Sequence, residues 1–156
     1  MNFWKMNADG CNYIILNNCE ETLPEALFPA LARELCSPPR SLGADGCLVV
    51  DRPQGLGDFR AFFYDAQGTA LPLSAGSGSC LCRYGFEAGL SSFSSRIETP
   101  EGMLAGQRIN RHQYSFSTED GQSLTADTKL VAKGEIFDED LPALYWLLSG
   151  ALCANA

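Results

Sequence analysis

A run of small residues in the middle of the chain is the feature best suited to chemistry. Residues 74–79 read Ser-Ala-Gly-Ser-Gly-Ser and lead into a predicted helix over 80–88, with Gly89 at its expected end. Small residues before a helix leave backbone N–H groups unpaired at the positive end of the helix dipole. The pattern predicts a loop that binds an anion such as a substrate carboxylate through Ala75, Gly76, Ser77 and Gly78. The alternative is a plain turn and helix cap, because the run matches neither the phosphate P-loop nor the nucleophile elbow.

Three other residues carry groups that take part in acid–base chemistry. Asp65 begins the sequence Asp-Ala-Gln-Gly, so it is either an acid or base facing a cleft or the residue that forms a turn. Asp45 stands in Gly-Ala-Asp-Gly, where its carboxylate either meets substrate or bonds its own backbone. Cys11 lies at the tip of a predicted hairpin and is either a reactive thiol or a buried apolar residue.

Composition excludes several classes of partner and site. Eleven basic residues against 19 acidic ones give a net charge of −8, which disfavours nucleic acid and anionic membrane surfaces as partners. The start of the chain has no secretory pattern, which predicts a cytoplasmic protein. Seven cysteines with no Cys-x-x-Cys pair predict reduced, buried thiols, with neither a metal site nor a disulfide framework. The one histidine, His112, follows Arg111 in a predicted edge strand and is expected at the surface.

The predicted elements are short strands and three helices. Alternation, β-branched runs and turn residues predict strands at 2–6, 12–17, 47–50, 59–64, 96–99, 103–109, 113–118 and 123–133. Helical spacing predicts helices at 24–36, 80–88 and 139–149. With no repeat or linker, the chain is expected to form one α+β domain over 1–156 rather than alternating βαβ units.

Several ordered blocks of the chain resemble one family. They are 3–6 (Phe-Trp-Lys-Met) with Gly10, 12–13 (Asn-Tyr), 43–48 (Gly-Ala-Asp-Gly-Cys-Leu), 63–68 (Phe-Tyr-Asp-Ala-Gln-Gly), Cys80 with 83–84 (Arg-Tyr) and 89–90 (Gly-Leu), and 99–102 (Thr-Pro-Glu-Gly). In order and spacing, residues 1–105 are similar to the N-terminal half of diaminopimelate epimerase and its relatives among the cofactor-independent amino-acid racemases. The resemblance implies a curved antiparallel β-barrel-like sheet around a central helix at about 77–89. It also implies a cleft between two such domains, in which two cysteines move protons without metal or cofactor.

The chain departs from that family at the positions that carry the chemistry. Ser74 stands where the family has its first catalytic cysteine, and an alcohol ionises far less readily than a thiol. A substrate-contacting asparagine falls on Cys11, or on Asn12 if the match slips by one, and a second falls on Asp65. Residues 110–156 are too few for the second domain and its cysteine.

We therefore expect a half-size enzyme acting on a small amino-acid-like carboxylate, by isomerase or by cyclase or lyase chemistry without the two-thiol mechanism. Ser74, Asp65 and Cys11 are its candidate catalytic residues, and the candidate substrate-binding residues are Asn12, Asp45, Ala75, Gly76, Ser77 and Gly78. A homodimer would restore a closed cleft, and no cofactor is expected. The alternative is a non-catalytic degenerate domain that binds a small molecule or a protein.

Overall fold

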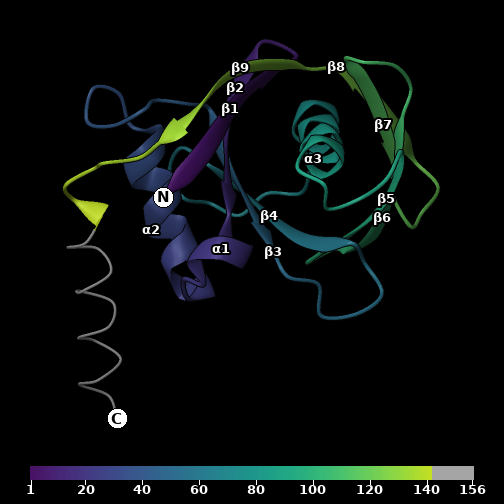
Figure 1. Cartoon of the computed structure of the whole chain (residues 1–156), viewed down its shortest axis with the longest axis horizontal. Helices are drawn as coiled ribbons and strands as arrows, with labels where there is room; N and C mark the ends of the chain where they lie inside the picture. The colour runs from purple at the N-terminus through teal and green to yellow at the C-terminus, as the bar shows by residue number, and fades with distance from the viewer. Residues whose placement is uncertain (142–156) are drawn as a thin grey trace.

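One curled sheet and a helix inside it make up the fold (Figure 1). The computed structural model describes residues 1–141. Strands and helices follow in the order β1 (Asn2–Ala8), β2 (Cys11–Asn17), α1 (Asn18–Glu21), the 3-10 turn η1 (Glu25–Leu27), α2 (Phe28–Cys36), β3 (Gly46–Asp51), β4 (Phe59–Asp65), α3 (Ala75–Glu87), β5 (Ser94–Thr99), β6 (Gly102–Arg108), β7 (Gln113–Ser117), β8 (Ser123–Asp127) and β9 (Lys129–Glu135).

All nine of these strands belong to one sheet in the order β8-β7-β6-β5-β4-β3-β2-β1-β9. The sheet curves around α3, which confirms the predicted barrel-like architecture with a central helix (Figure 1). Most neighbours are antiparallel, but β2 pairs with β3 and β4 pairs with β5 in parallel. Helices occupy both of these crossover connections, α1 and α2 in the first and α3 in the second. The sheet is therefore mixed and not wholly antiparallel as the resemblance implied, because a parallel partner cannot be read from the local sequence pattern.

Alternating side chains of the central strands build two hydrophobic cores. Met6, Tyr13, Ile15 and Leu48 point inward and pack with α3. Their sequence neighbours point outward and pack against α2, among them Ile14, Leu16, Cys47 and Val49. The outward core places α1 and α2 outside the sheet (Figure 1). A sheet covered on both faces explains why these strands read as nearly continuous apolar runs.

The two edges of the sheet meet at Thr128, the single residue between β8 and β9. The Thr128 hydroxyl donates to the backbone carbonyl of His112 at 2.7 Å. From inside the barrel, the buried Arg83 guanidinium donates to the Thr128 carbonyl at 3.0 Å and to its hydroxyl at 3.2 Å. The buried Arg83 on the central helix therefore stabilises the junction between the two edge strands, β8 and β9. The predicted single strand over 123–133 is consequently two strands.

The central helix begins earlier than its sequence indicated. Ala75 is its first residue, so the small-residue run is part of α3 rather than a loop ahead of it. Glycine is required there because α3 passes very close to the sheet: a Cβ on Gly78 would overlap the ring of Phe116 in β7. Small residues that read as flexible in the sequence thus serve close helix–sheet packing.

The helix expected over 24–36 forms as η1 followed by α2, with Pro29 in the first turn, where its missing N–H costs nothing. Most of the helix predicted at 139–149 lies outside the described residues. Across residues 1–141, no helix has both the length and the apolar character needed to span a bilayer.

Candidate functional site

The candidate site lies where β1 ends, β2 begins and α3 starts. Tyr13 of β2 is buried at this point, and its hydroxyl lies beside the first turn of α3. A Cβ on Gly76 would stand only 3.2 Å from the Tyr13 hydroxyl oxygen and 3.2 Å from the Ala8 carbonyl oxygen. The Ser74 hydroxyl and the Cys11 thiol lie close enough to this hydroxyl to influence its pKa. This end of the barrel therefore gathers two hydroxyl groups, a thiol and the start of a helix.

Ser74 is the N-cap of α3 and forms a reciprocal capping box with Ser77. The Ser74 N–H donates to Ser77 Oγ at 2.8 Å, and the Ser77 N–H donates to Ser74 Oγ at 3.2 Å. The Gly78 N–H donates to the Ser74 carbonyl at 2.9 Å. Within the described residues, the N–H groups of Ala75 and Gly76 have no acceptor. These two donors, at the positive end of the helix dipole, are what remains to hold an anion.

Tyr13 stays protonated at this site. Burial is the main cause that raises its pKa to about 12, and the nearby Cys11 raises it further, whereas the Ser74 hydroxyl lowers it. A phenol with such a pKa donates a hydrogen bond near neutral pH and does not act as a base. Burial also raises the pKa of Cys80, one turn further along α3, to about 12. Neither group is a source of negative charge at the site.

Cys11 is the half-buried thiol of this cluster. It shares the inward face of β2 with Tyr13 and packs against the inner core. It is the first residue of β2, directly after the turn of the first hairpin. Of the three candidate catalytic residues, Cys11 and Ser74 are brought together around Tyr13.

Asn12 and Asp45 lie on the opposite face of the sheet and bind each other's backbone. The Asn12 N–H donates to Asp45 Oδ2 at 2.7 Å, and the Asp45 N–H donates to the Asn12 carbonyl at 2.9 Å. The Asn12 side-chain oxygen accepts a hydrogen bond from Asn7 at 3.1 Å. These contacts join the start of β2 to the loop before β3. The Asp45 carboxylate therefore bonds the backbone of Asn12 and not its own backbone.

Asp65 forms the turn after β4. Its Oδ1 accepts hydrogen bonds from the N–H groups of Gln67 and Thr69, each at 2.9 Å, and its carbonyl accepts one from Gly68. Gly68 has a φ of +81°, which favours glycine. The geometry agrees with the turn alternative for Asp65.

Tyr13 is the residue that the sequence reasoning missed. The available signal was alternation: in a strand starting at Cys11, residues 11 and 13 point to the same face. Its aromatic ring reads as an ordinary core residue, and only the fold shows that the hydroxyl reaches the start of α3.

An apolar hollow of about 180 Å³ opens next to this site. Strands β4 and β5 pair only through residues 59–60 and 97–98 and then diverge. Leu73, which precedes Ser74, lines the hollow together with Phe63, whose ring lies edge-on to Tyr13 at 5.8 Å. Pro100 and Glu101 lie across from them. The hollow could take an apolar part of a ligand whose anionic end lies at α3.

No family model matches the chain, but curated proteins and solved structures do. The diaminopimelate epimerase of Aquifex aeolicus is 24% identical over 140 residues, covering 81% of this chain and 50% of the relative. The diaminopimelate epimerase of Halothermothrix orenii is 30% identical over 112 residues, covering 70% of this chain and 39% of the relative. The chain spans about half or less of the length of these two relatives.

The similar solved structures are isomerases and related proteins. A methylitaconate-delta-isomerase superposes with a TM-score of 0.62 at 10% identity, covering 87% of this chain and 94% of that one. A hydroxyproline epimerase from Agrobacterium vitis superposes with a TM-score of 0.59 at 12% identity, covering 75% and 41%. A phenazine biosynthesis PhzF-family protein from Enterococcus faecalis gives 0.56 at 12% identity, covering 73% and 42%.

The sheet curled around one helix is thus a fold that this chain shares with these solved structures. The resemblance to the diaminopimelate epimerase-like family that the sequence blocks predict is confirmed.

Proposed function

We propose that the chain is one half of the catalytic unit of an isomerase that acts on a small amino-acid-like carboxylate. The observation that carries the proposal is the pair of unpaired N–H groups at Ala75 and Gly76, beside the hydroxyls of Ser74 and Tyr13. Two converging donors and a helix dipole suit a carboxylate group. The curated relatives are diaminopimelate epimerases, which supports chemistry at a carbon atom next to that group.

Cys11 is the group we assign to proton transfer on this half. Ser74 fills the family's thiol position, and its hydroxyl is held in the capping box, so it orients the carboxylate rather than removing a proton. Cys11, as its thiolate, would take the α-proton, and the opposite face of the substrate would receive a proton from a second domain. Inversion results if the same carbon is reprotonated from the opposite face, and elimination results if a leaving group departs with the bonding electrons instead.

A second copy of the chain is the source we propose for the second domain. In the family, two similar domains enclose the substrate, and this chain aligns with part of its relatives. The six cysteines among the described residues are free thiols, which supports a reducing, cytoplasmic setting. No cofactor enters the proposed reaction.

The alternative function is binding without catalysis. Ser74 in place of a thiol and the protonated Tyr13 favour it, because neither group takes a proton from carbon near neutral pH. The same N–H pair would then hold a carboxylate ligand without converting it.

Deuterium exchange separates the two functions. The protein is incubated in deuterated water with a panel of amino acids, and loss of the α-proton signal is followed by NMR. Enzymatic function predicts exchange that is abolished in Cys11→Ser and kept in Cys19→Ser, a matched half-buried thiol in α1. In Ser74→Cys, which restores the family residue, exchange should increase.

Binding of the same amino acids is read from the amide signals of Ala75 and Gly76. Shifts at these amides without exchange would support the binding function instead. If the amide signals do not shift and no exchange occurs, both functions are refuted at this site. The mass of the protein in solution tests the proposal that a second copy of the chain supplies the second domain. A monomer that still catalyses exchange would refute that proposal.

A further inference from the structure

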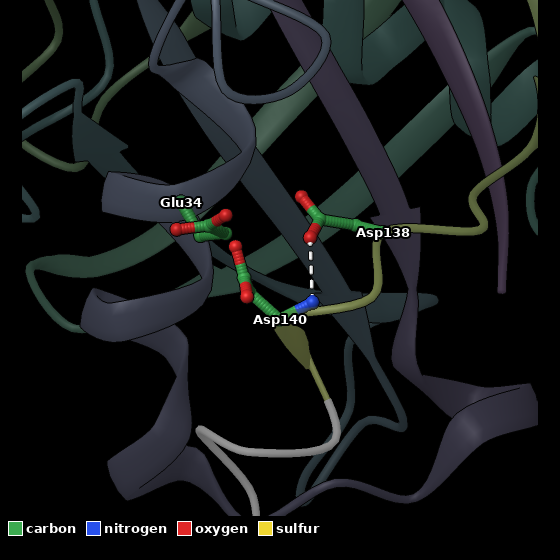
Figure 2. A group of neighbouring side chains, drawn as sticks. All are labelled: Glu34, Asp138 and Asp140. Carbon is green, nitrogen blue, oxygen red and sulfur yellow. Dashed lines mark hydrogen bonds between the residues drawn. The ribbon is translucent and has the colours of Figure 1, made fainter.

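Three carboxylates converge on the outside of the barrel, far from the site described above. Glu34 comes from α2, and Asp138 and Asp140 follow β9 along the chain. One oxygen from each lies within 4.8 Å of the others. Figure 2 shows the three side chains facing a common space.

Within residues 1–141, two inner oxygens of this cluster have no hydrogen-bond partner. The Glu34 side chain is only 7% exposed, and its Oε1 is buried without a hydrogen bond in the described part of the chain. The Oδ2 of Asp138 is likewise buried and unbonded. Buried carboxylate oxygens are normally paired or bound to a metal. Two unsatisfied oxygens that face each other's carboxyl groups therefore point to a missing positive charge.

Arg40 supplies part of that charge from the rim. It contacts Glu34 Oε2 at 3.1 Å and Asp140 Oδ2 at 3.3 Å, and its side chain is 61% exposed. Three carboxylates and one guanidinium leave two negative charges uncompensated, and neither Glu34 Oε1 nor Asp138 Oδ2 has a hydrogen bond to the guanidinium. Burial and the neighbouring Asp138 also raise the pKa of Glu34.

We propose that Glu34, Asp138 and Asp140 form a binding site for a hard divalent cation of the Ca²⁺ type. An all-oxygen ligand set suits such a cation. Ca²⁺ accepts carboxylate oxygens in a flexible geometry, whereas Mg²⁺ requires a nearly ideal octahedron and gives up its water ligands reluctantly. Three carboxylates from two separate segments of the chain therefore suit Ca²⁺ better.

The surroundings give the cation a way in and a supply of water ligands. An open hollow of about 460 Å³ adjoins the cluster, lined by Arg40, Ser41 and residues of the segment 135–140. Asp140 is 61% exposed, so water molecules complete the coordination on that side. A bound ion would join α2 to the segment that follows β9.

Calorimetric titration of the full chain with CaCl₂, after treatment with a chelator, tests the site. We expect one saturable site, and an affinity for Mg²⁺ at least tenfold lower. Glu34→Gln and Asp138→Asn should each weaken Ca²⁺ binding at least tenfold. Asp127→Asn, an exposed acid on β8, is the matched control and should bind as the parent does.

Thermal unfolding provides a second readout, since both substitutions also relieve repulsion. Ca²⁺ should raise the unfolding temperature of the parent and of Asp127→Asn, and not that of Asp138→Asn. An equal rise with NaCl of the same ionic strength would show simple screening and overturn the proposal. So would unaltered Ca²⁺ binding in Asp138→Asn. The proposal would also be overturned if the parent showed no saturable Ca²⁺ binding and both variants were more stable than the parent. That result would show that the carboxyl groups of Glu34 and Asp138 share a proton instead.

Discussion

Replacing Gly78 with alanine tests how closely the central helix must approach the sheet. A Cβ at this position would overlap three atoms of the Phe116 ring. Phe116 is 1% exposed, so the ring has no free space into which to move. Overpacking of this kind costs up to about 3 kcal/mol, while alanine in place of glycine stabilises a helix by about 1 kcal/mol.

The difference is a net loss of about 2 kcal/mol in the free energy of unfolding. For a chain of this size, that lowers the unfolding temperature by about 4–8 °C. Urea and thermal denaturation measure both quantities. Gly76→Ala is the control, because its Cβ meets its nearest neighbours at 3.2 Å, a milder contact that should cost less.

Phe116→Leu removes part of the obstructing ring and should lessen the effect of Gly78→Ala in the double variant. The reasoning is refuted if Gly78→Ala is as stable as the parent protein. In that case the cost of close approach would be no larger than the gain in helix propensity, and packing against Phe116 would not require glycine at this position.

Three further predictions concern the N-cap of α3, the turn after β4 and the buried thiol of Cys36. Ser74→Ala removes the hydroxyl of the capping box and should lower the free energy of unfolding by about 1 kcal/mol in urea denaturation, with Ser74→Gly losing less; equal losses would contradict the cap. Asp65→Ala should lose about 1 kcal/mol because two N–H groups lose their acceptor, whereas Asp65→Asn keeps an oxygen there and should retain both stability and any α-proton exchange. Loss of exchange in a stable Asp65→Asn would instead indicate an acid–base role. Burial raises the pKa of Cys36 from 9.0 to about 12, so the folded state holds this proton more tightly than the unfolded state. Stability should be complete below about pH 9 and fall as the pH rises toward 12, by about 2 kcal/mol per such thiol at pH 10.5. Cys36→Ala should show a smaller fall between urea series at pH 7 and pH 10.5, and identical slopes would contradict this linkage.

The strands and the helix inside the barrel were predictable because their signals are local. The aromatic and β-branched runs at 2–6 and 12–17 and the turn residues at 7–10 define the first hairpin. The same locality hides the parallel pairing of β2 with β3, whose partner is set by how α2 packs on the outer face. The start of α3 was misplaced because Gly76 and Gly78 lower helix propensity, and only contact with β7 shows why they are there.

At the candidate site, sequence reasoning named the start of α3 but not its partner. Ser74 and Tyr13 are 61 positions apart and meet only in the fold. The carboxylate cluster is a stronger case, since Arg40 reaches an acid 100 residues away. From the sequence alone, the acidic residues around Asp138 and Asp140 are expected on a solvated surface, and only the fold shows that the buried Glu34 lies beside them.

The pairing of β1 with β9 has a consequence for the order in which the protein is made. Of the described strands, β1 is synthesised first, and it gains its neighbour β2 at once but its neighbour β9 only after Glu135 has been synthesised. Until then β1 has an unpaired edge, and Arg83 lacks its hydrogen-bond acceptor Thr128. Completion of the barrel therefore waits for nearly all of the described chain, and in the meantime the free edge of β1 is open to pairing with another chain.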